Sequence, residues 1–156
     1  MAWQKFCQRP IVTVPPETTI LEACRVLERQ QIGCLLVEEQ GELCGILTGR
    51  DMALRVMGLG RDPQQTMVWN LMTPNPVRIA VDRTLHELIT LMHRQHVRRV
   101  PIIDETGKAI GIVMLDDLLI LLGDELSDVG KTVAETLLHP SLAAKPAAYP
   151  WWAMHA

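Results

Sequence analysis

Hydrophobic and polar residues along the first third of the chain follow a pattern typical of strands alternating with helices. Apolar stretches at 11–14, 34–37 and 44–48 have the length and composition of β-strands. Between the first two, apolar residues recur at helical spacing, at Ile20, Ala23, Cys24 and Leu27. A second helix is predicted over 51–57, so the expected order of elements is β-α-β-β-α.

The same order returns in the second half of the chain. Strands are predicted over 77–80, 100–103 and 109–114, with one helix after Thr84 and another over 116–122. A shift of 65 residues lays the first copy on the second, and after one inserted residue the shift becomes 66. Matched residues kept in one order with a single gap indicate an internal repeat.

Each copy opens its first helix with a threonine followed three residues later by a glutamate, Thr19 with Glu22 and Thr84 with Glu87. This spacing is typical of a capping box. One copy of roughly fifty residues is too small to bury both faces of its own sheet. We therefore predict an α+β fold in which two β-α-β-β-α units pack sheet against sheet about a pseudo-twofold axis, as one domain.

The expected boundaries follow from this repeat. Repeat one covers 8–57, the linker 58–70 and repeat two 71–124, and an exposed helix is predicted over 125–138. Residues 139–156, rich in Ala and Pro, are expected to form a mobile tail. Its adjacent Trp151 and Trp152 leave docking of the tail, on a dimer or on a partner, as an alternative.

Composition excludes several classes of protein. Hydrophobic residues make up 48% of the 156 residues, so a packed core is expected. A net charge of -3 offers no basic stripe for nucleic acid. We see no signal peptide and no apolar run long enough to cross a membrane, so we expect a cytoplasmic protein. The cysteines show no C-x-x-C pair, and Cys24, Cys34 and Cys44 are expected to be small core residues.

Three stretches carry a resemblance to a known family: "GILTGRD" at 45–51, "LMTPNPVRI" at 71–79 and "VRRVPIIDETGKAIGIV" at 97–113. Over residues 8–124 the chain resembles a tandem pair of cystathionine-β-synthase (CBS) domains, the Bateman module. The resemblance implies clefts between the repeats that bind adenosine ligands such as AMP, ADP or ATP. It also implies a homodimer that regulates an enzyme or channel, here a separate and unidentified protein target.

The stretch "GILTGRD" suits a nucleotide on physical grounds as well. A strand passes into a helix within about three residues, and free amides at a helix start attract phosphate. The Thr48 hydroxyl can bind a phosphate oxygen, Asp51 can accept from two ribose hydroxyls, and Ile46 and Leu47 offer apolar surface to a base. The alternative is that Asp51 only caps the helix.

The resemblance pairs each aspartate with a strand of the other repeat. For Asp51 that strand carries Arg98 and Arg99, which would hold the phosphate, with surface salt bridges as their alternative role. The resemblance places the base near Met72, Thr73 and Val77, with Arg50 as an extra phosphate contact. The cleft of Asp117 has lost these groups, because Gly33 and Cys34 replace the arginines and Met114 replaces the threonine. We therefore predict one competent site and a weak second site at Asp117, Val12 and Cys34.

No P-loop, activated nucleophile or metal cluster can be read from the chain, so we expect neither an enzyme nor a bound cofactor. His93 and His96 lack a third metal ligand and are expected to be solvated. The predicted function is a regulatory module that binds an adenine nucleotide and signals energy state. The alternative is a ligand-free CBS dimer that acts as a protein-interaction scaffold.

Overall fold

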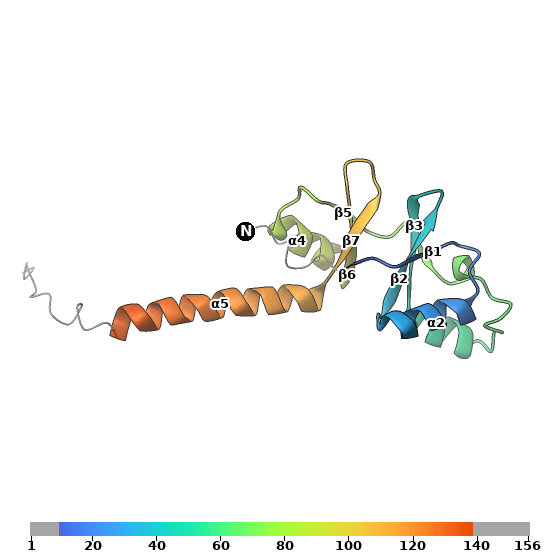
Figure 1. The fold of residues 1–156 in the computed structure, drawn as a ribbon, viewed down its shortest axis with the longest axis horizontal. Coiled ribbons are helices and arrows are strands. Elements are labelled where there is room, and N and C mark those ends of the chain that lie inside the picture. The colour runs from blue at the N-terminus through green and yellow to red at the C-terminus, as the bar shows by residue number, and fades with distance from the viewer. Residues whose placement is uncertain (1–9, 139–156) are drawn as a thin grey trace, which may run out of the picture. The chain divides into compact units, whose positions relative to one another are not determined.

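The computed structural model describes residues 10–138, which contain two β-sheets (Figure 1). The first sheet has the order β1-β2-β3-β4, with β1 Thr13–Val14, β2 Cys34–Glu39, β3 Glu42–Thr48 and β4 Thr73–Pro74. The second has the order β5-β6-β7, with β5 Ile79–Ala80, β6 Arg99–Ile103 and β7 Ala109–Met114. The predicted α+β class and its doubling are confirmed.

The two sheets are built by the same rule. In each, a short strand pairs parallel with the first strand of a hairpin, whose second strand is antiparallel to the first. A helix joins the parallel strands, α2 (Ile20–Gln30) in one repeat and α4 (Leu85–Gln95) in the other. Cys34 pairs with Thr48 and Arg99 with Met114, so the inserted residue of the second copy lies in the turn of its hairpin.

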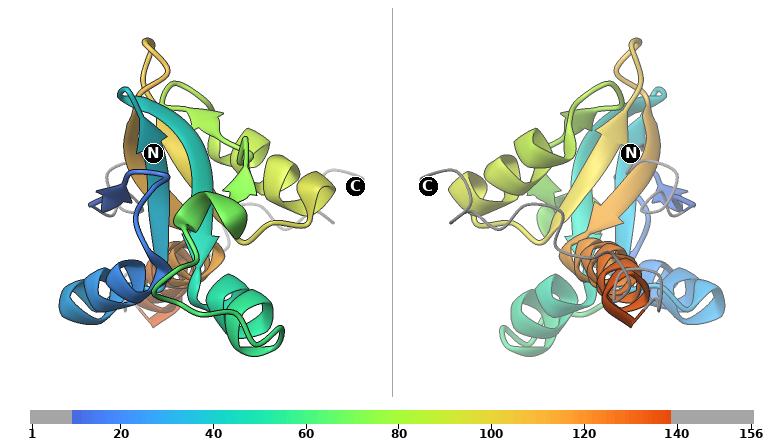
Figure 2. Two further views of the ribbon diagram at one scale, coloured as in Figure 1. Left: turned by 90° about the vertical axis from the view of Figure 1, so that its right-hand side faces the viewer. Right: turned by 90° about the vertical axis from the view of Figure 1, so that its left-hand side faces the viewer.

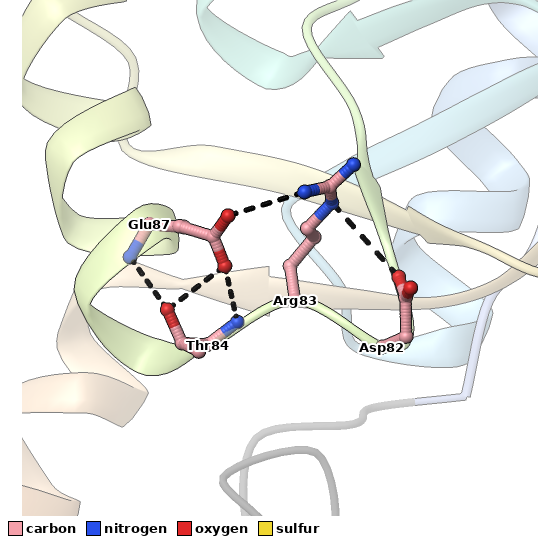
Figure 3. Close-up of polar contacts among 4 residues, drawn as sticks. All are labelled: Asp82, Arg83, Thr84 and Glu87. Atoms are coloured by element: carbon pink, nitrogen blue, oxygen red, sulfur yellow. Dashed lines mark hydrogen bonds and ion pairs between the residues drawn. The ribbon is translucent and has the colours of Figure 1, made fainter.

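Side chains fix where α2 and α4 begin. The Thr84 hydroxyl accepts from Glu87 N–H at 3.2 Å, and the Glu87 carboxylate accepts from Thr84 N–H at 2.8 Å (Figure 3). Arg83 donates to the same carboxylate at 3.2 Å. At Thr19 only the hydroxyl half of the expected box forms, with Glu22 N–H as donor at 3.2 Å. Both helices end on a left-handed residue, Gln31 and His96.

The first hydrophobic cluster lies between the first sheet and its helices. Its fully buried members include Leu35, Val37 and Leu47 from the sheet and Val68 from a 3-10 turn, η2 (Val68–Asn70). Met72 packs directly on Gly45, where an added Cβ would stand 2.3 Å from its sulfur. The start of the second repeat therefore lies on the sheet of the first, as β4, an edge strand that the sequence did not predict.

A second cluster lies between the two sheets. Cys34, Leu36 and Leu43 of the first repeat pack with Ala109 and Ile112 of the second. Figure 2 shows the β2–β3 and β6–β7 hairpins side by side. The sheet-against-sheet packing predicted from the repeat is confirmed, because one face of each hairpin is buried by the other.

Two closing helices differ from the expectation. The first copy ends in one turn of α-helix, α3 (Gly49–Met52), which continues as a π-helix, η1 (Ala53–Met57). The second copy ends in α5, which runs unbroken from Leu115 to Leu138 and so joins the closing helix to the exposed helix expected after it. Residues up to Leu118 form one structural unit, and those from Leu119 onward form a second.

Several smaller expectations have mixed outcomes. Cys34 is buried and Cys44 half-buried, but Cys24 is exposed, because it lies beside the buried stripe of α2 rather than on it. No helix among residues 10–138 is long and apolar enough to span a membrane. Cys7 and the tail with Trp151 and Trp152 lie outside the described residues.

Candidate functional site

The turn after β3 brings together Thr48 and Asp51. The Asp51 carboxylate accepts from Thr48 N–H at 3.0 Å and from the Thr48 hydroxyl at 2.6 Å. The same hydroxyl accepts from Asp51 N–H at 3.2 Å. Asp51 therefore caps α3, which is the alternative role that the sequence left open. Arg55 lies 3.7 Å from Asp51 and donates to the Leu71 carbonyl at 2.5 Å, so this turn is tied to the start of repeat two.

The turn after β7 repeats the backbone part of this arrangement. The Asp117 carboxylate accepts from Met114 N–H at 3.4 Å, as Asp51 does from Thr48. Met114 has no hydroxyl, so the short side-chain contact of the first turn has no counterpart here. The two carboxylates thus occupy matched positions at the ends of β3 and β7.

The two arginines of β6 and its approach have different surroundings. Arg98 is 71% exposed and its Nη2 lies 3.3 Å from the Asp116 carboxylate, which is the surface ion pair foreseen as an alternative. Arg99 is half-buried, and its Nε is buried without a hydrogen-bond partner in the described structure. Its Nη2 lies 3.8 Å from the place of a Cβ on Gly33, so Arg99 reaches across to the first repeat.

Arg99 lines a cavity of about 520 Å³ between the repeats. The wall is formed by Val12, Cys34 and Leu36 from one repeat and by Ile112 and Met114 from the other. Burial raises the pKa of the Cys34 thiol, and the positive charge of Arg99 acts in the opposite direction. The cavity is therefore mostly apolar, with one permanent cation in its wall.

This placement differs in one respect from what the sequence suggested. Val12, Cys34 and Met114 mark the cleft that was predicted to be the weaker one, and Arg99 was assigned to the other cleft. Gly33 is compatible with this arrangement, since even an added Cβ would meet the guanidinium group at an ordinary contact distance of 3.8 Å. From the sequence, Gly33 was expected only to lack the positive charge of its counterpart Arg98, and its contact with Arg99 was not predicted.

The other predicted residues are dispersed around β3. Thr73 pairs with Ile46 across β3 and β4, so the structure brings these two together, with Met72 beside Gly45. Leu47 points the other way, into the core of the first repeat, and is fully buried. Val77 is half-buried and Arg50 is exposed.

Residues missed by the sequence analysis include Gln30 and Gln31, which add polar groups to the cavity wall. They lie at the end of α2, where the chain turns from the helix towards β2. Their place between the last apolar position of the predicted helix, Leu27, and the predicted strand at 34–37 was a signal that could have found them.

The histidines do not form a metal centre with their neighbours. The rings of His93 and His96 are 6.5 Å apart, between centroids. Within residues 10–138 there is no group of three or more His, Cys, Asp or Glu side chains that could hold a metal ion.

The comparison with known proteins adds to this geometry. The family model of the CBS domain matches the chain twice, over residues 4–58 and 68–124. The chain is a CBS-domain protein. The two matches coincide with the two copies found in the fold, so this CBS-domain protein holds a tandem pair.

Three similar proteins illustrate the relationship. The CBS domain-containing protein YhcV of Bacillus subtilis is 39% identical over 110 residues, which cover 70% of this chain and 77% of YhcV. A structure with CBS domains from Burkholderia ambifaria has a TM-score of 0.67 at 30% identity, over 74% of this chain and 84% of that one. The cytosolic domain of the Mg²⁺ channel MgtE, solved in complex with ATP, has a TM-score of 0.63 at 28% identity, over 77% of this chain and 51% of that one.

Several curated relatives are longer than this CBS pair. The chain spans 59% of a relative from Methanopyrus kandleri and 22% of one from Arabidopsis thaliana.

Proposed function

We propose that this CBS pair is a non-catalytic regulatory module that binds an adenine nucleotide, AMP, ADP or ATP, between its repeats. Arg99 carries the proposal, because its Nε is buried without a hydrogen-bond partner in the wall of a mostly apolar cavity. A buried donor on a permanent cation is costly unless an acceptor meets it. Phosphate oxygens fit a guanidinium group, which can bind two of them at once.

The rest of the cavity suits the other parts of a nucleotide. Its volume of about 520 Å³ is in the range of small-molecule sites. The apolar side chains of Val12, Ile112 and Met114 offer a surface for a flat base. The Asp117 carboxylate is not in the cavity wall, but it accepts from the backbone of Met114, which is, and we assign it to the ribose hydroxyls. The complex of the MgtE domain with ATP supports this class of ligand.

The turn of Thr48 and Asp51 is the second candidate site. Its groups are those predicted from the sequence, with Arg50 and Arg98 for phosphate and Met72, Thr73 and Val77 for the base. Here Asp51 already accepts two hydrogen bonds from Thr48, and Arg98 is paired with Asp116. A ligand at this turn has to compete with these contacts, whereas the Nε of Arg99 has no hydrogen-bond partner in the described structure, which favours the Arg99 cavity.

Calorimetric titration of the purified protein with AMP, ADP and ATP tests the proposal. Arg99→Gln should weaken the tightest of these ligands by about 10- to 100-fold, the value of a charge-assisted hydrogen bond. Arg98→Gln is the matched control and should leave affinity unchanged. The affinities of Asp117→Asn and Asp51→Asn are then compared. The variant that loses affinity identifies the carboxylate that binds the ribose.

Two results would count against this site. Loss of affinity in Arg98→Gln and Asp51→Asn, with Arg99→Gln unaffected, assigns binding to the other turn. No heat and no change in melting temperature with any adenosine ligand favours the alternative, a ligand-free CBS dimer that acts as a scaffold.

Regulation requires that the nucleotide binds one arrangement of the two repeats more tightly than another. A nucleotide that bridges the repeats stabilises one arrangement of them and changes the surface offered to a separate target protein, as a signal of energy state. Couplings of about 1–3 kcal/mol are sufficient for such a response. We place this activity in a cytoplasmic homodimer that neither turns over its ligand nor needs a cofactor.

A further inference from the structure

Helix α5 carries a stripe of apolar side chains that nothing in the described structure covers. Five residues form it and are between 44% and 73% exposed: Leu119, Leu122, Leu126, Val129 and Val133. We name these five residues the α5 seam. All of them belong to the unit that begins at Leu119.

The spacing of the α5 seam is that of a coiled coil. Leu119, Leu126 and Val133 are seven residues apart, and Leu122 and Val129 lie between them at the alternating intervals of three and four. Residues so placed occupy the a and d positions of a heptad repeat. Asp124, Asp128, Lys131 and Glu135 fall at the c and f positions, away from the seam. The ion pair of Lys131 with Asp128 lies on that polar side.

Helix α5 also contains residues that weaken a solitary helix. Gly123 and Gly130 lie in its interior, and nothing is within 4 Å of a Cβ placed on either one. Glycine is among the poorest helix formers, and helices in proteins depend mainly on burial of an apolar face. A 24-residue helix with two glycines and an exposed stripe is therefore expected to need a partner for the seam.

We propose that the α5 seam pairs with the same seam of a second copy of this chain. A different partner in a coiled coil is usually selected by charges at the e and g positions. Among the described residues of α5 at these positions, 116, 118, 123, 125, 130, 132 and 137, two are charged: Asp116, which pairs with Arg98, and Glu125. The leucine and valine layers can pack against the same layers of a second copy, and Asp124, Asp128 and Glu135 lie away from that contact. The seam runs from Leu119 to Val133, just over two heptads, or roughly 21 Å of helix.

Charge-matched variants test this pairing in the full chain. Leu126→Glu with Val129→Glu adds two negative charges to the seam, and Lys131→Glu changes the net charge by the same amount on the polar side. Sedimentation equilibrium should give the seam variant a dimer dissociation constant that is at least roughly tenfold higher than that of the wild type. The Lys131→Glu control should associate as the wild type does, and both should keep the thermal transition of the repeats.

Hydrogen exchange separates the seam from any other contact between copies. We expect the amides of 119–137 to gain protection as protein concentration rises, and to lose that gain in the seam variant alone. Protection that does not depend on concentration would mean that α5 lies on its own chain. An unchanged dissociation constant in the seam variant would mean that other surfaces hold the copies together. Either result overturns the proposal, which does not depend on nucleotide binding.

Discussion

Single side chains decide how the two matched turns of this CBS pair differ. Thr48 and Asp51 are joined by three hydrogen bonds, two of which use the Thr48 hydroxyl, whereas Met114 has no hydroxyl and donates its backbone N–H to Asp117. The sequence predicted this difference, since it follows from residue type at matched positions. The direction of Arg99 could not be predicted in the same way. Its side chain lies towards Gly33 of the other repeat, and this direction depends on how the two repeats pack.

A carboxylate at the start of α4 makes stability depend on pH. Hydrogen bonds from the Thr84 backbone and hydroxyl, and then Arg83, lower the pKa of Glu87 below its ordinary 4.5. The folded state thus prefers the charged form. The stabilisation is complete above the ordinary pKa and is lost as pH falls through the lowered value.

Urea unfolding at neutral and acidic pH measures this effect. Glu87→Gln should be less stable than the wild type at pH 7, and the two curves should converge in acid. Glu22→Gln is the matched control, because Glu22 does not close its box with Thr19, and this variant should stay close to the wild type at both values. A difference between Glu87→Gln and the wild type that persists in acid would contradict the assignment.

The elements were predicted where local chemistry sets them. Both capping threonines mark the helix starts, and the strand over 109–114 has the predicted bounds, because α5 begins directly after it and has Asp116 and Asp117 in its first turn. Elements that depend on tertiary contacts were missed. Strand β4 exists through pairing with β3, and the π-helix η1 lies where Arg55 is held by the Leu71 carbonyl. The continuity of α5 through Gly123 was missed, since glycine locally favours a helix end.

The β2–β3 hairpin allows a test at this scale. Its turn residues Gln40 and Gly41 both have positive φ, 53° and 85°, as a type I′ turn requires. Gly41→Ala should therefore lower the free energy of unfolding by about 1 kcal/mol or more. Gln40→Asn should raise it by roughly 0.5 kcal/mol, since asparagine tolerates this conformation better. Gln64→Asn, at a position whose own φ is not positive, should leave the free energy of unfolding unchanged, and chemical denaturation compares all three variants.

At the scale of the whole molecule, the repeats depend on one another for burial. Leu36 is 2% exposed and packs with Ala109 and Ile112 of the other repeat. Neither sheet could bury this face alone, so the region from β1 to β7 should unfold as one cooperative unit.

Leu36→Ala tests this cooperativity. The cavity that it leaves should lower the free energy of unfolding by about 2–5 kcal/mol. Hydrogen exchange should show β6 and β7 losing protection together with β2 and β3, although the change lies in the first repeat. Leu54→Ala, at a side chain 58% exposed, should cost less than about 0.5 kcal/mol. Protection that survives in the second repeat of Leu36→Ala would show that the halves unfold separately.

The bare backbone at Gly33 has a consequence for the duplication itself. The residue matched to Gly33 is Arg98, so a protein made from two second halves would set a long cationic side chain where Arg99 now rests. Two first halves would leave the cavity with no cation at all. The two halves share one fold, but their side chains at the cavity differ. Neither half can therefore replace the other without changing the cavity.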